Sequence, residues 1–161
     1  MMALALSGKL LRRPDWIHSA EREANHWTVH LLASRGNLHG MNPGPVLYPE
    51  QPYGMEVIVQ GLVQLYRSTK KDHYARLAGL AASWFLGNNT AGRAMYDSRT
   101  GRVFDGIDEK GVNYNSGAEA TISGLLALQE VLEYPQMASY LPCRETAARR
   151  FRIWPARSET P

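Results

Sequence analysis

Residues 53–86 read YGMEVIVQGLVQLYRSTKKDHYARLAGLAASWFL, and this stretch decides the fold class. Its first part, 53–68, is apolar on most sides of a helix. The one polar stripe of this helix holds Glu56, Gln60, Gln64 and Arg67. A second helical pattern follows at 72–86, after a turn of only three residues. We therefore expect an antiparallel helical hairpin in which 53–68 is an inner helix.

Two more patterns predict helices on either side of this hairpin. Residues 14–35 begin with a proline, which suits the first turn of a helix. Their apolar residues recur at spacings of three and four and are expected to face the core: Trp16, Ala20, Ala24, Trp27 and Leu31. Residues 117–134 form the fourth predicted helix, which is expected to bury Ile122, Leu125, Leu128 and Leu132. The predicted fold class is thus all-α, made of helical hairpins of α/α type.

Two segments between these helices are not expected to be helical. Residues 36–54 hold four prolines and four glycines, so they are expected to run as an ordered loop. In the loop 88–116 we expect a small β-hairpin that pairs 94–96 with 102–104. Long loops of this kind usually carry function or cover something.

Composition excludes several classes of protein. The chain has 161 residues, 44% of them hydrophobic, which suffices for one domain with a sizeable core. Its single cysteine, Cys143, cannot form an internal disulfide, which favours a cytoplasmic setting. The longest uncharged run, 77–92, is too short to span a bilayer, so no membrane partner is expected.

The positive charge of the chain is confined to its C-terminal end. Residues 1–140 hold 13 Lys and Arg against 13 Asp and Glu, so the body of the protein is neutral. We expect 1–134 to be the helical domain and 135–161 to be a weakly determined basic tail with a short helix at 145–151. Because no basic stripe accompanies this tail in the body, a nucleic-acid partner is not expected.

Polar side chains gather in residues 87–121, GNNTAGRAMYDSRTGRVFDGIDEKGVNYNSGAEAT. Asp, Asn and Tyr are abundant in this loop and in the helix start that it feeds. These side chains hydrogen-bond sugar hydroxyls, and aromatic faces stack on sugar rings. Loops held by packed helices are also where binding groups tend to collect. The stretch therefore indicates a carbohydrate ligand.

The same stretch carries a series of motifs in a fixed order. They are Trp-Phe-x-Gly-Asn-Asn at 84–89, Tyr-Asp at 96–97, Thr-Gly at 100–101, Phe-Asp-Gly at 104–106 and Asn-x-Asn-x-Gly-Ala-Glu at 113–119. Together with Gly92 and Tyr53-Gly54, this order resembles the C-terminal part of the six-hairpin glycosidase superfamily. Within it, the resemblance is greatest to bacterial proteins encoded with, or fused to, glycosyltransferases. It covers roughly residues 14–134.

The resemblance implies an α/α toroid whose inner-helix starts and loops face a carbohydrate cleft. A complete toroid of six hairpins needs twelve helices, whereas the sequence predicts four firm ones, so the expected fold is a partial (α/α)6 toroid. The missing half then lies on another chain or on a second copy. Alternatively, the chain is a fragment that has lost activity.

Three carboxylates are candidates for catalysis. We expect Asp105 to be the proton donor, because its place between Phe104 and Ile107 would partly desolvate it, as suits a general acid. Glu119 or Asp97 would then be the base or nucleophile. The residues expected to bind the sugar are Asn88, Asn89, Tyr96, Asn113, Asn115, Tyr53 and Glu56, with Tyr48 and Tyr114 as further stacking candidates.

These carboxylates also have structural interpretations. Glu119 follows Ser116 by three positions at a predicted helix start, which is the pattern of a capping box. Asp97 precedes the turn 98–101 and could hold it through its carboxylate. Glu56, on a mostly buried helix, is expected either to pair with an arginine, such as Arg67 or Arg93, or to line a polar cavity, and the ion pair is the favoured interpretation.

Two further groups of residues on the predicted helices are metal-ligand candidates and aromatic side chains. Three residues share one face of the first predicted helix but lack the glutamate that zinc peptidases place beside the first histidine: Glu23, His26 and His30. No metal or other cofactor is therefore expected. Trp16, Trp27 and Trp84 fall on apolar helix faces and are expected to be core residues.

The sequence favours two functions, and a third, a plain helical interaction module, leaves the polar loop unexplained. The first is a carbohydrate-active protein of glycoside hydrolase type, and the alternative is a non-catalytic subunit that binds glycan or completes a partner of a glycosyltransferase or glycosidase system. The predicted inner helix 53–68 is apolar on both flanks, and four helices do not suffice to cover it. We therefore expect the protein to act as a homodimer or to pair with a second half-toroid chain.

Overall fold

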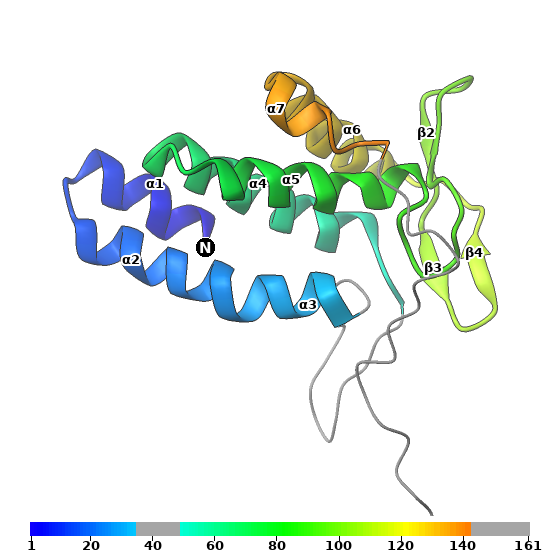
Figure 1. Ribbon diagram of the computed structural model, residues 1–161. Helices are drawn as coiled ribbons and strands as arrows, with labels where there is room; N and C mark the ends of the chain where they lie inside the picture. The colour runs from blue at the N-terminus through cyan, green and yellow to red at the C-terminus, as the bar shows by residue number, and fades with distance from the viewer. Residues whose placement is uncertain (35–48, 143–161) are drawn as a thin grey trace, which may run out of the picture.

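The computed structural model describes residues 1–34 and 49–142, which fold into a mostly helical protein with two small β-hairpins (Figure 1). The helices are α1 (Met2–Leu10), α2 (Pro14–Glu23), α3 (Val29–Ser34), α4 (Pro52–Thr69), α5 (Asp72–Ala82), α6 (Ala118–Leu132) and α7 (Pro135–Ala138). Residues 36–48 of the predicted loop 36–54, which include Tyr48, and the predicted helix 145–151 lie outside the described residues.

The hairpin of α4 and α5 confirms the prediction made from residues 53–86. Pro52 occupies the first turn of α4, and Lys70 adopts the left-handed conformation that ends the helix, with φ of 58°. Asp72 then begins α5, which continues as a 3-10 turn, η2 (Ser83–Leu86). Most apolar side chains of α4 are buried, among them Met55, Val59, Leu62, Val63 and Leu65, whereas Val57 is 59% exposed. α4 is therefore an inner helix, as expected.

The helix α1 was not predicted, and it corrects the expectation that α4 would remain partly uncovered. Met1 packs on Gly61 of α4, where an added Cβ would lie 2.4 Å from the Met1 Cε atom. One turn of α1 further on, the Ser68 hydroxyl donates a hydrogen bond of 3.1 Å to the Ala5 carbonyl. Both α1 and α4 therefore run in the same direction, and α1 covers a flank of α4 that the sequence left open.

The helix α6 also runs in the direction of α4. At the C-terminal ends of the two helices, the Arg67 guanidinium lies 2.8 Å from the Glu130 carboxylate and 3.0 Å from that of Glu133. At their N-terminal ends, Tyr53 and Glu119 line one pocket. α2 and α5 follow their partners after short turns and run back. Of the three parallel helices α1, α4 and α6, the first two are thus each followed by a return helix, which is an α/α arrangement.

The buried face of α6 differs from the one predicted. Leu128 is buried as expected, but Ile122 is 57% exposed, and Leu125 and Leu132 are exposed as well. The buried positions are mostly small: Ala120, Ser123, Gly124, Ala127, Leu128 and Val131. An added Cβ at Gly124 would lie 2.6 Å from a methyl carbon of Val103. Close approach of the neighbouring elements thus selects small residues on this face and turns the larger ones outward.

The first predicted helix forms but contains a π-helical segment, η1 (Ala24–Thr28), between α2 and α3. A π turn adds one residue to the helical repeat and rotates the side chains that follow. As a result Thr28 is buried and Trp27 is 43% exposed, so the prediction that Trp27 is a core residue is wrong. Trp84 is buried as predicted, and Trp16 is half-buried.

Two β-hairpins follow η2, and one of them was predicted. Strands β1 (Tyr96–Asp97) and β2 (Arg102–Val103) pair antiparallel, with Tyr96 opposite Val103. The unpredicted second hairpin pairs β3 (Gly106–Asp108) with β4 (Gly111–Asn113). Glu50 extends this hairpin through two backbone hydrogen bonds with Ile107, of 2.8 and 2.9 Å. The chain just before α4 is thereby tied to the loop just before α6.

The chain beyond α6 continues to pack on the helices. Met137 of α7 is fully buried, and Leu141 is buried after it. Gly79 of α5 makes room for this segment, because an added Cβ there would lie 2.2 Å from the Met137 carbonyl oxygen. Within the part of the chain that the structure describes, no helix has the length and apolar character needed to cross a membrane.

Candidate functional site

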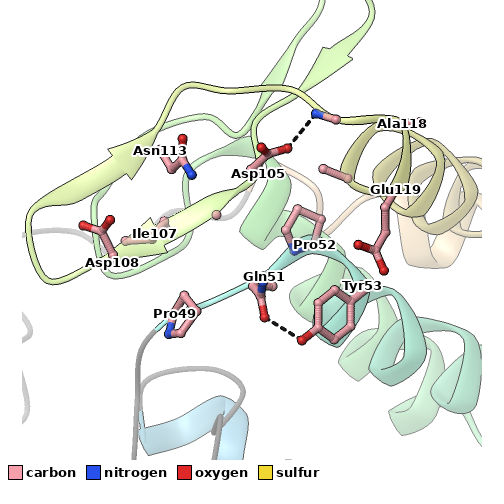
Figure 2. Close-up of a pocket in the computed structure, with 13 residues that line it drawn as sticks. Pro49, Gln51, Pro52, Tyr53, Asp105, Ile107, Asp108, Asn113, Ala118 and Glu119 are labelled. Atoms are coloured by element: carbon pink, nitrogen blue, oxygen red, sulfur yellow. Dashed lines mark hydrogen bonds between the residues drawn. The ribbon is translucent and has the colours of Figure 1, made fainter.

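A pocket of about 590 Å³ lies where the N-terminal ends of α4 and α6 meet the second hairpin (Figure 2). Three segments that are distant in the sequence form it: the chain entering α4, the β3–β4 hairpin and the first turn of α6. The described residues that line it are Pro49, Gln51, Pro52, Tyr53, Asp105, Gly106, Ile107, Asp108, Asn113, Gly117, Ala118, Glu119 and Ala120. The parallel arrangement of α4 and α6 is what brings their N-terminal ends to one place.

Asp105 is held against the start of α6. Its Oδ1 atom accepts a hydrogen bond of 2.7 Å from the Gly117 backbone N–H, and its own N–H donates to the Asn115 carbonyl at 2.8 Å. The side chain is half-buried rather than enclosed between Phe104 and Ile107. Asp105 thus lines the pocket and satisfies a backbone donor at the helix start through one of its two carboxylate oxygens.

Glu119 lines the same pocket but does not form the capping box that the sequence predicts. The residue that caps α6 is Gly117, with no side-chain hydrogen bond to the helix start. The Ser116 hydroxyl instead lies 3.2 Å from that of Thr121. Glu119 is exposed and makes no hydrogen bond or ion pair with the described part of the protein. Its carboxylate is therefore available to a ligand.

Tyr53 and Asn113 complete the set of predicted residues that meet at the pocket. The Tyr53 hydroxyl donates a hydrogen bond of 2.5 Å to the Gln51 side chain, which fixes the ring at the pocket edge (Figure 2). Asn113 accepts a hydrogen bond of 3.1 Å from the Asn115 backbone N–H. The pocket thus offers carboxylates, two amides and an exposed aromatic ring, which is a combination suited to a polyhydroxylated ligand.

Asp97 does not line this pocket. Its carboxylate accepts hydrogen bonds from the Arg99 backbone N–H at 3.0 Å and from the Thr100 hydroxyl at 2.8 Å. The hydrogen bond from Arg99 and then that from Thr100 lower the pKa of Asp97 below its ordinary value. Gly101 follows with a φ of 74°, which glycine adopts without strain. These contacts confirm the turn-forming interpretation of Asp97.

Five other residues predicted to bind the ligand also lie outside the pocket lining: Asn88, Asn89, Tyr96, Asn115 and Glu56. Asn88 donates to the Ser83 hydroxyl at 2.8 Å, and Asn89 donates to the Trp84 and Arg93 carbonyls. Tyr96 packs against the core from β1. The two asparagines therefore brace the loop after η2.

The expected ion pair of Glu56 is wrong. Glu56 accepts a hydrogen bond of 2.9 Å from Gln60, one turn further along α4. Arg67 instead pairs with two glutamates of α6, which its long side chain reaches from the last turn of α4. Tyr114, a further stacking candidate, is exposed and contacts the edge of Phe104, with ring centroids 5.0 Å apart.

Glu50 is an important residue beneath the pocket that sequence reasoning missed. It is only 1% exposed, and it accepts hydrogen bonds from the Trp84 indole N–H at 2.7 Å and from the Thr90 hydroxyl. Burial raises the pKa of Glu50, and the two hydrogen bonds partly oppose this effect. Its neighbours Pro49 and Gln51 line the pocket. The one available signal was an acidic residue in a proline-rich segment next to a predicted inner helix.

The electrostatic character of the pocket is acidic. The described lining residues include Asp105, Asp108 and Glu119 and no Lys, Arg or His. Across residues 1–34 and 49–142, no three His, Cys, Asp or Glu side chains lie close enough together to hold a metal ion. Two separated carboxylates in one pocket can in principle donate and accept protons, and can accept hydrogen bonds from hydroxyl groups.

Comparison with known proteins adds no relative to this description. No protein-family model matches the sequence, and no curated protein matches it.

Proposed function

We propose that this protein binds a glycan in the pocket between α4, α6 and the β3–β4 hairpin, as a carbohydrate-active protein of glycoside hydrolase type. One observation carries the proposal: three site residues predicted from the stretch 87–121 line the same pocket as Tyr53, which was predicted from the start of α4, and the three are Asp105, Asn113 and Glu119. The resemblance to six-hairpin glycosidases and the α/α arrangement support it. In this proposal the chain forms part of an (α/α)6 toroid.

The carboxylate of Asp105 is held by a hydrogen bond, whereas that of Glu119 is held by none from the described residues, and this difference suggests different roles. Asp105 would donate the proton to the leaving group through Oδ2, since Oδ1 is held by the Gly117 backbone N–H. Glu119, which has no partner in the described part of the protein, would be the base or nucleophile. Tyr53 and Asn113 would contact the sugar ring and its hydroxyls.

The test is binding and turnover with a panel of oligosaccharides and aryl glycosides. Binding is followed by ligand-observed NMR, and turnover by release of the aryl group. Glu119→Gln and Asp105→Asn should abolish turnover while the protein stays folded, because asparagine can still accept the Gly117 hydrogen bond. Asp97→Asn, outside the pocket, is the matched control and should keep full activity. Binding of no member of the panel would contradict the proposal.

The alternative is a non-catalytic subunit, which binds glycan and completes a partner. The observation in its favour is that α1 and α6 expose large apolar side chains. The same panel separates the two proposals, since binding without turnover, lost in Glu119→Gln and Tyr53→Ala but not in Asp97→Asn, supports the non-catalytic subunit.

A further inference from the structure

α1 and α6, which both pack along α4, bury small side chains and expose large ones. α1 buries only Ala5 and Gly8. Its exposed apolar residues, with Leu10 71% exposed, are Met2, Leu4, Leu6 and Leu10. On α6, Leu132 is 61% exposed, and Ile122, Leu125 and Leu126 are exposed as well. Exposed large apolar side chains on two helices of one small protein indicate surfaces that another molecule covers.

Three of the four exposed apolar residues of each helix form a stripe along it. Positions four apart on α1 place its side chains on one side, and we name Met2, Leu6 and Leu10 the α1 stripe. Positions three and seven apart do the same on α6, and we name Ile122, Leu125 and Leu132 the α6 stripe. α4 contacts both helices, through Gly61 and Ser68 towards α1 and through Arg67 towards α6.

The charges at the C-terminal ends of the two helices are opposite. The end of α1 carries Lys9, Arg12 and Arg13, of which Arg13 pairs with Asp15 at 2.7 Å and Lys9 donates a hydrogen bond of 3.1 Å to the Arg67 carbonyl, which leaves its charge uncompensated. This leaves an excess of positive charge beside Leu10. The end of α6 carries Glu130 and Glu133, which share the single partner Arg67 and leave an excess of negative charge beside Leu132.

We propose that a second copy of this chain covers both stripes, with the α1 stripe of each copy lying against the α6 stripe of the other. A two-fold axis parallel to the helices preserves their direction, because rotation about such an axis does not invert them. Since α1 and α6 run parallel within one chain, their C-terminal ends then meet across both contacts. The basic end of α1 is therefore placed beside the acidic end of α6.

Charge favours this arrangement over contact between two α6 stripes. In that alternative the two-fold axis is perpendicular to the helices. The C-terminal end of α6, with Glu130 and Glu133, would then meet the N-terminal end of α6 in the other copy, which carries Glu119. Both ends are acidic and would repel one another. The parallel arrangement has no such conflict, covers two stripes per chain and closes with two copies. It is independent of whether the pocket binds a glycan.

The first measurement is the mass of the full chain by light scattering over a range of micromolar concentrations. We expect about 36 kDa, twice the 18.0 kDa of one chain. Leu10→Glu and Leu132→Glu should each shift the mass to that of a monomer, because each disrupts both contacts of a two-fold pair. Leu80→Glu, at an exposed leucine of α5 outside both stripes, is the matched control and should remain dimeric. Circular dichroism checks that each variant is folded.

Mixing the two variants tests the pairing itself. In a mixed pair of Leu10→Glu and Leu132→Glu chains, both substitutions fall in one contact and the other contact is unaltered, so dimer should reappear. Should either variant fail to fold, the surface charges provide a second test: Arg12→Glu and Glu133→Lys should each weaken the dimer at least tenfold, and the two together should restore it. A monomeric wild-type chain, or a dimer unaffected by either stripe, would overturn the proposal.

Discussion

The Asp105 carboxylate accepts a 2.7 Å hydrogen bond from the Gly117 backbone N–H, and so joins the loop before β3 to the residue that caps α6. The same contact orients one of the two carboxylates of the proposed site. A single side chain thus has both a structural and a functional part, and the two can be separated by substitution.

Removal of this hydrogen bond should destabilise the protein. We expect Asp105→Ala to lower the free energy of unfolding by about 0.5–2 kcal/mol, as loss of a helix cap does. Asp105→Asn should cost less, because its side-chain oxygen can still accept the Gly117 hydrogen bond. Ser116→Ala should have little effect, since Ser116 does not cap α6. Urea denaturation measures all three, and a larger cost for Ser116→Ala than for Asp105→Ala would contradict the assignment.

Glu50 should make stability depend on pH. Burial raises its pKa in the folded protein, so the folded state binds the proton more tightly than the unfolded state does. The contribution of Glu50 to stability is therefore most favourable at pH values below its pKa in the unfolded state. This contribution is lost as the pH rises through its higher pKa in the folded state. Glutamine does not titrate, so the stability of Glu50→Gln relative to that of the wild type should increase as the pH is raised from 4 to 7. Thermal melts at both pH values measure the difference, and a difference that moves the other way would refute the sign.

Gly124→Ala should destabilise the contact between α6 and β2. The added Cβ would lie 2.6 and 3.0 Å from the two methyl carbons of Val103 and 3.2 Å from the Phe85 ring. Overpacking of this kind costs about 1–3 kcal/mol, which exceeds the gain from replacing a helical glycine by alanine. Gln129→Ala, exposed on the same helix, is the control and should change the free energy of unfolding by less than about 0.5 kcal/mol.

The ion pair between Arg67 and Glu130 should couple the C-terminal ends of α4 and α6. Both side chains are about 30% exposed, so water and salt screen their attraction. A double-mutant cycle with Arg67→Ala and Glu130→Ala should give a coupling free energy of about 0.5–1 kcal/mol. The coupling should decrease at high salt. A coupling free energy of zero at low salt would show that these two side chains stabilise the contact by packing and not by their charges.

The helical hairpin of α4 and α5 could be predicted because local pattern and tertiary packing agree there. On α6 they disagree, since hydrophobicity favours burial of Ile122 and Leu125 whereas the close approach of Val103 favours Gly124. The exposure of Trp27 depends on a π turn that no sequence period announces. α1 escaped prediction because the side chains that it buries, Ala5 and Gly8, are too small to give a hydrophobic period.

In the candidate site, too, some residues could be predicted from the sequence and others could not. Loop composition pointed to Asp105, Glu119 and Asn113, and the structure places all three around one pocket. The asparagines at 88 and 89 have the same chemistry, yet they are used to brace a loop. Glu50 could not be recognised in advance, because only the fold brings the indole of Trp84 to its carboxylate.

The shared direction of α4 and α6 has a consequence for the electrostatics of the pocket. The peptide dipoles of a helix add up to a macrodipole whose N-terminal end is equivalent to about half a positive charge. Two such ends meet at the pocket, where Asp105, Asp108 and Glu119 gather and none of the described lining residues is basic. The backbone itself therefore supplies part of the positive potential that offsets these carboxylates. Their negative charge is thus partly compensated without a lysine or arginine among the described lining residues.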